Sequence, residues 1–88
     1  MEKKELEKIF KAFANRRRLT IVSYLKQAGE RNVNGVAAEL DLSIAATSRH
    51  LVNLERTGIL EKQQRDKEVF YRLAQQKIIF INEIFKEL

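Results

Sequence analysis

The chain has 88 residues, with 17 lysines and arginines against 12 aspartates and glutamates, and a net charge of +5. This length predicts one small, marginally stable domain, and the absence of cysteine excludes disulfides as its support. No apolar run approaches the roughly 20 residues of a membrane span, and the charged N-terminus lacks the apolar core of a signal peptide. The basic charge suits a polyanionic partner, and the lack of cysteine fits a cytoplasmic location.

Residues 3–14 and the segment that follows them read as two amphipathic helices. Apolar residues of the first recur at helical spacing, namely Leu6, Ile9, Phe10 and Phe13. Asn15 is a suitable N-cap for the second helix, and Gly29 a suitable C-cap. The triplet Arg16, Arg17 and Arg18 opens the second helix, where positive charge opposes the helix dipole. The triplet is therefore either a contact to phosphate or a solvated cluster.

A helix-turn-helix is predicted over residues 35–57. Residues 30–33 form a short, extended connection, after which Asn34 can cap a helix that ends at Leu40. The turn at 41–43 leads into a second helix, which begins after the capping residue Ser43 and ends before Gly58.

Two faces can be distinguished on the helix at 44–57. Thr47, Leu51 and Leu54 share the inner face, and the opposite stripe carries Ala45, Arg49, Val52 and Arg56, with Ser48 beside it. Small residues allow close approach to DNA, and an arginine can bond guanine bidentately in the major groove. An ordinary surface helix is the alternative. His50 is the only histidine, so packing or a phosphate contact is a better reading than a metal site.

Residues 59–73 read as a β-hairpin with strands at 59–64 and 68–73. The charged residues 65–68 join the strands and place Arg65 and Lys67 at the tip. A basic tip can reach a phosphate or an adjacent minor groove. Since Asp66 and Glu68 cancel much of the charge, a solvated turn is the alternative.

The last segment, 75–88, is predicted to be a helix with too many apolar residues for a solvated tail. Its partner surface is expected to be the first helix together with a second copy of the chain, an intrachain core being the alternative. The predicted dimer interface therefore comprises Leu6, Ile9, Phe10, Phe13, Ile78, Ile81, Ile84, Phe85 and Leu88.

These residues resemble the ArsR/SmtB family of winged-helix repressors over nearly the whole chain. The most specific stretches are LSIAATSRHLVNLERTGIL and VFYRL, with AFANRRRLTIVSYL before them. The resemblance implies a mostly α fold with a small β-hairpin, the winged helix-turn-helix, which forms a homodimer through its first and last helices. It also implies base contacts at Ala45, Ala46, Ser48 and Arg49, and a wing tip at Arg65 and Lys67.

The chain departs from this family at its metal-sensing positions. Where many members carry a Cys-x-Cys pair, this chain has Asn32 and Asn34. The last helix has no histidine and only Glu83 and Glu87 as acidic residues. Position 52, often basic in the family, is Val52, so one phosphate contact is missing. We therefore expect no metal site, no cofactor and no thiol-based sensing.

Together these observations predict a homodimeric, sequence-specific DNA-binding regulator, a repressor that occludes a palindromic operator. The expected DNA-binding residues are Ser43, Ala45, Ala46, Ser48, Arg49, His50, Arg65, Lys67 and Arg18. Two alternatives stay open: a protein-interaction module, and a regulator that binds a small molecule between its first and last helices. No phosphate loop, carboxylate pair or nucleophile pair indicates an enzyme.

Overall fold

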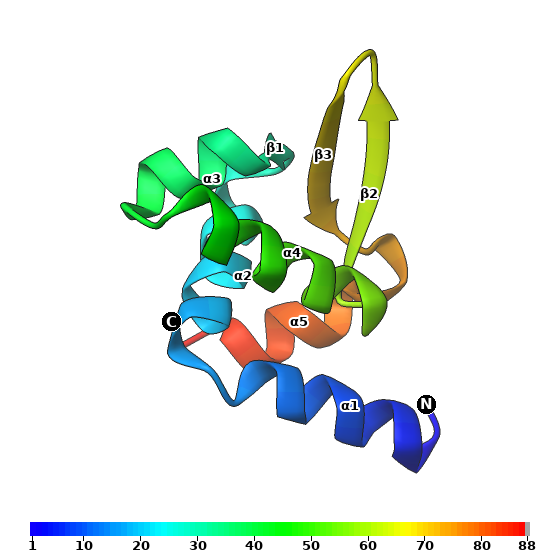
Figure 1. Ribbon diagram of the computed structural model, residues 1–88. Helices are drawn as coiled ribbons and strands as arrows, with labels where there is room; N and C mark the ends of the chain where they lie inside the picture. Colours follow the sequence, from blue (N-terminus) through cyan, green and yellow to red (C-terminus); the bar gives the residue numbers. More distant parts are fainter. Residues whose placement is uncertain (88) are drawn as a thin grey trace.

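A computed structural model of the chain describes residues 1–87 and confirms the predicted winged helix-turn-helix (Figure 1). Within these residues the elements are, in order, α1 (Lys3–Phe13), α2 (Arg16–Ala28), β1 (Arg31–Asn32), α3 (Val33–Leu40), α4 (Ile44–Arg56), β2 (Leu60–Arg65), β3 (Glu68–Leu73), the 3-10 helix η1 (Gln75–Lys77) and α5 (Ile78–Phe85). The last predicted helix is thus shorter than expected, because its first turn is 3-10 and α5 ends at Phe85.

Side-chain caps define the starts of three helices. The Asn15 side chain accepts from the Arg18 amide at 3.0 Å, and Ser43 Oγ accepts from the Ala46 amide at 3.1 Å, as predicted. The predicted cap at Asn34 is wrong, because α3 begins at Val33 and its cap is Asn32. Asn32 Oδ1 accepts from the Gly35 amide at 2.8 Å. A Cβ at Gly35 would lie 2.9 Å from this oxygen, so a residue with a side chain would crowd the cap.

Left-handed residues close both helices of the helix-turn-helix. Asp41 has a φ of 53° at the end of α3, and the Leu42 amide then bonds the Ala37 carbonyl at 2.9 Å. Gly58 has a φ of 81° after α4, and the Ile59 amide bonds the Leu54 carbonyl at 3.0 Å. These closures direct the chain tightly from α3 into α4 and from α4 into the wing.

The wing belongs to a three-stranded antiparallel sheet of order β1-β3-β2. β2 and β3 pair from Leu60 opposite Leu73 to Arg65 opposite Glu68. The connection is therefore two residues, Asp66 and Lys67, where the sequence suggested four. Asp66 has a φ of 57°, which a short acidic residue tolerates. The paired strands stand away from the helices as a narrow hairpin (Figure 1).

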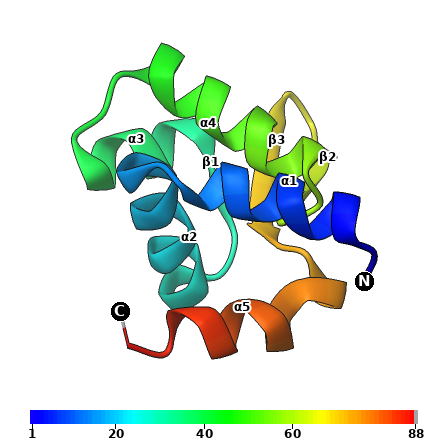
Figure 2. The same ribbon diagram turned by 90° about the horizontal axis from the view of Figure 1, so that it is seen from below.

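The core collects buried apolar side chains from all five α-helices and from β2 and β3. Figure 2 shows α2 between α4 and α5, so it contributes to the centre of the core through Ile21, Val22 and Leu25. α5 joins this core through Phe85, whose ring lies edge-on against Phe13 with centroids 5.1 Å apart. The core thus fixes α4 from behind and leaves its opposite face exposed.

Candidate nucleic-acid interface

The outer face of α4 has the form that the sequence predicted. Thr47, Leu51 and Leu54 are fully buried, whereas Ala45 and Arg49 are exposed. Ser48 is half-buried beside them, and Ser43 is occupied as the N-cap. The first two turns of α4 therefore present a slim surface with one guanidinium, which suits entry into a major groove about 12 Å wide.

The prediction that Ala46 contacts DNA is wrong. Its side chain is 8% exposed, because it points toward the helices that pack behind α4. Ala46 lies next to the inner residue Thr47 on the helix, whereas Ala45 lies on the outer side with Arg49, four residues on. Ala46 thus serves the packing of α4; helical spacing placed only Ala45 on the outer stripe, and the family resemblance implied a base contact at Ala46.

The structure brings Arg18 and His50 together beside α4. Burial lowers the pKa of His50, and the charges of Arg18, Arg49 and Arg17 lower that pKa further. Arg17 and Arg18 of α2 and Arg49 of α4 therefore lie near the same imidazole. Arg18 Nε donates to the Ala12 carbonyl at 2.7 Å, so this half-buried guanidinium is fixed against the end of α1.

The two basic residues of the wing differ in their surroundings. The Arg65 guanidinium lies over the Phe70 ring, 4.1 Å from its centroid, and forms an ion pair with Glu30. This side chain folds back over the sheet rather than extending from the tip. Lys67 lies in the exposed turn itself and takes part in none of the ion pairs among residues 1–87. Lys67 is therefore the better placed of the two for DNA contact.

Four of the nine predicted dimer residues lie in the core of the protomer. They are nearly inaccessible, so assigning them to a subunit interface is wrong: Ile9, Phe13, Ile81 and Phe85. The other described members are exposed or half-buried, namely Leu6, Phe10, Ile78 and Ile84, and Leu88 lies outside the described residues. The exposed set also includes Ile79, 82% exposed, which is not among the predicted dimer residues.

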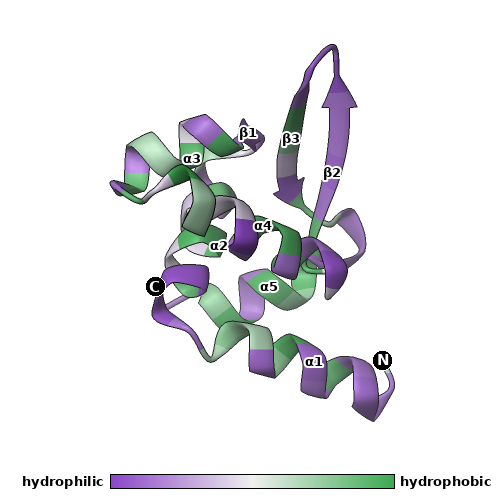
Figure 3. Cartoon of the chain, viewed as in Figure 1, coloured by the Kyte–Doolittle hydropathy of each residue, from purple (hydrophilic) through white to green (hydrophobic). Residues whose placement is uncertain are grey.

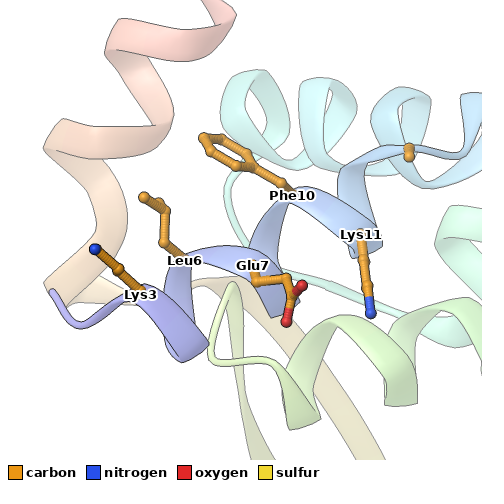
Figure 4. Close-up of a pocket in the computed structure, with 6 residues that line it drawn as sticks. Lys3, Leu6, Glu7, Phe10 and Lys11 are labelled. Atoms are coloured by element: carbon orange, nitrogen blue, oxygen red, sulfur yellow. The ribbon is translucent and has the colours of Figure 1, made fainter.

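Exposed apolar side chains of α1 surround an open hollow of about 460 Å³. Figure 4 shows Leu6 and Phe10 pointing to one side of α1, while Glu7 and Lys11 point to the other. In Figure 3 much of α5 is also hydrophobic. The two largest hollows described do not lie between the first and last helices, where a small-molecule crevice was predicted. One is lined by residues of α1 and Ala14, and the other by residues of α2 and Leu40.

The residues at the family's metal-sensing positions do not fit a thiophilic metal. The Asn32 side chain caps α3 with its oxygen and donates through Nδ2 to Glu68 Oε1 at 2.7 Å, so both ends are already bonded. Asn34 is exposed and offers only an amide, where soft metal ions prefer thiolates. Among residues 1–87, no group of three or more His, Cys, Asp or Glu side chains is placed to bind a metal ion.

Within residues 1–87, no helix combines the length and the apolar character needed to cross a bilayer.

Comparisons with known proteins agree with the geometry. Residues 15–62 match the family model described as bacterial regulatory protein, arsR family. The cadmium resistance transcriptional regulatory protein CadC of Listeria innocua is 35% identical over 81 residues, which cover 89% of this chain and 68% of CadC. The transcriptional activator HlyU of Vibrio cholerae is 34% identical over 80 residues, which cover 91% of this chain and 73% of HlyU.

A solved structure shares the fold over almost the whole chain. The homodimeric winged helix-turn-helix DNA-binding domain Mb0332 of Mycobacterium bovis, described as a possible ArsR-family regulator, has a TM-score of 0.84 and 27% identity. The match covers 96% of this chain and 77% of that domain. The chain therefore belongs to the arsR family of bacterial regulatory proteins, a family of winged helix-turn-helix DNA-binding transcriptional regulators.

Proposed function

We propose that this chain acts as a homodimeric repressor that binds an imperfectly palindromic operator and occludes the promoter. The observation that carries the proposal is the outer face of α4, where Ala45, Ser48 and Arg49 form a slim surface beside the arginines of α2. Ser48 and Arg49 are the proposed base contacts, since a serine can bond a base edge and an arginine can bond guanine O6 and N7. Lys67 is the proposed wing contact to phosphate.

Apolar exposure on α1 and α5 supports the proposed dimer. Phe10, Ile79 and Ile84 are 51%, 82% and 40% exposed, which is a large apolar surface for an 88-residue chain. Covering these side chains with a second copy adds the buried area that a small domain lacks. Mb0332, which shares the fold, is described as homodimeric. A two-fold axis would present two α4 helices to successive major grooves, about 34–36 Å apart.

Repression is proposed because a dimer that spans two major grooves blocks polymerase access to the same duplex. HlyU is named an activator, so the direction of control needs its own measurement. Metal control is not proposed, since Asn32 and Asn34 offer no suitable donors.

The test begins with selection of genomic DNA fragments by the purified full chain, followed by gel shift and in vitro transcription. We expect one enriched motif with two half-sites about 10 base pairs apart, or a multiple of that spacing. Transcription from a promoter that overlaps the motif should fall as protein is added. Absence of any enriched motif would favour the protein-interaction module, and a rise in transcription would overturn repression while leaving DNA binding intact.

A further inference from the structure

A second basic surface lies beside α4, and Arg18 is the one residue of it that the sequence predicted to contact DNA. It is a hollow of about 160 Å³ lined by Lys8, Lys11, Ala12, Arg18, Asn53 and Thr57. The lining side chains supply three cations and one amide, with no carboxylate, and the Thr57 hydroxyl already donates to the Leu54 carbonyl at 2.9 Å. We propose that this hollow binds a backbone phosphate of the operator, on the flank of α4 opposite the wing. The proposal rests on the DNA-binding function proposed above.

The place of the hollow on α4 supports this assignment. Asn53 follows Arg49 by four residues, so it lies about one turn further along nearly the same face of α4. The two residues are about 6 Å apart along the helix axis. Glu55, on the opposite flank of α4, faces the wing, where its carboxylate is 3.7 Å from Lys62 Nζ. In Figure 1, α1 runs along one side of α4 and the wing stands on the other. A helix in the major groove has a phosphate backbone on each side, so a cationic flank opposite the wing is placed to contact the second backbone.

The charges in the hollow are already oriented. The bond from Arg18 Nε to the Ala12 carbonyl fixes the guanidinium plane, and a fixed guanidinium suits bidentate binding of phosphate. Lys8 and Lys11 are three residues apart on α1 and therefore lie on one side of it. Lys11 points away from Leu6 and Phe10 (Figure 4), which separates the cationic side of α1 from its apolar side. None of the ion pairs among residues 1–87 involves Lys8, Lys11 or Arg18, so their charges are not held in an ion pair there.

The test compares Lys8→Ala with Lys26→Ala, which removes the same charge elsewhere. Lys8 is chosen because Lys11 also lines the apolar hollow, and alanine preserves the helix. Lys26 lies in the last turn of α2, about 12 Å along the helix axis from Arg18. Binding of each variant to the selected operator and to a scrambled duplex is measured by fluorescence anisotropy between 50 and about 200 mM salt, the range in which phosphate contacts dominate the change.

For Lys8→Ala we expect a log–log salt slope reduced by about 0.9 and an equal loss of affinity on both duplexes. Lys26→Ala should stay close to the wild-type slope. Asn53→Asp, which places a carboxylate in the hollow with little change of shape, should weaken binding at least as much as Lys8→Ala. Sedimentation should show the same oligomer for Lys8→Ala and the wild type.

Two outcomes separate this inference from the proposed function. If the wild type selects a motif but Lys8→Ala behaves like Lys26→Ala, the phosphate site is overturned and DNA binding stands. If the wild type selects no motif, the proposed function is overturned, and the phosphate site falls with it. A changed oligomer for Lys8→Ala would also overturn the site, because the lysine would then belong to a subunit interface.

Discussion

The hydroxyl of Thr47 offers a sharp test of how α4 is held in the core. Thr47 is fully buried, and its Oγ1 has no hydrogen-bond partner within the described residues. An unpaired buried hydroxyl costs about 1–3 kcal/mol in protein mutation data. Valine has nearly the same shape and a similar helix propensity, and replaces the hydroxyl with a methyl group. We therefore expect Thr47→Val to raise the free energy of unfolding by about 1–2 kcal/mol.

The effect of Thr47→Val can also be measured as a change in Tm. For a domain of this size, each kcal/mol shifts Tm by about 4–8 °C, so Thr47→Val should raise Tm by at least about 4 °C. Urea unfolding at one fixed protomer concentration measures the free energy, because the stability of a dimer depends on concentration. Operator affinity should not change, since Thr47 faces the core and not the outer side of α4.

Thr20→Val is the matched control for this prediction. Thr20 is exposed, and its Oγ1 donates to the Arg16 carbonyl at 2.9 Å. Its replacement should change stability by no more than about 0.5 kcal/mol, as is usual for surface positions. The reasoning is refuted if Thr47→Val is no more stable than the wild type while Thr20→Val stays neutral, because the buried hydroxyl would then have a partner.

Three further predictions concern DNA binding, pH and assembly. Arg49→Ala should lose about 1–3 kcal/mol on the operator and little on random DNA, whereas Lys67→Ala should weaken both and lower the salt slope by about one; equal losses for Arg49→Ala would remove its base-reading role. Because the pKa of His50 is lower in the folded chain, the unfolded chain binds a proton at His50 first as the pH falls. The contribution of His50 to the free energy of unfolding is therefore fully present above about pH 6.5 and is lost below it. His50→Gln should flatten this fall in urea midpoints between about pH 5 and 8, and unchanged slopes would contradict the assignment. Phe10→Glu should yield monomers in sedimentation, since it places a charge on the exposed apolar side of α1, and an intact dimer would move the interface elsewhere.

Local interactions explain what could be predicted from the sequence. The caps at Asn15 and Ser43 bond an amide three residues away, and Gly58 adopts a positive φ where an added Cβ would meet no atom within 4 Å. Helical spacing likewise placed Thr47 and Leu51 inward and Arg49 outward. These signals were enough for the winged helix-turn-helix and for the inner and outer faces of α4.

Long-range packing explains what could not be predicted. Arg65 meets Glu30, 35 residues earlier, only because β1 and β2 flank the same strand. Asn32 is the cap of α3, in place of Asn34, because it ends the strand paired with β3. The basic hollow combines α1, α2 and the end of α4, and no local pattern joins those three segments.

The order of the elements, the two faces of α4 and the absence of thiolate ligands follow from the amino-acid sequence, because each depends on residue type and on neighbours within about one helical turn. Which apolar residues of α1 and α5 lie inside the protomer and which stay exposed depends instead on how distant segments pack. Ile9 and Phe10 are adjacent and equally apolar, yet they are 0% and 51% exposed. Ile9 packs in the core cluster with residues of α2 and α5, whereas Phe10 lies outside that cluster, and only packing between distant segments sets this difference.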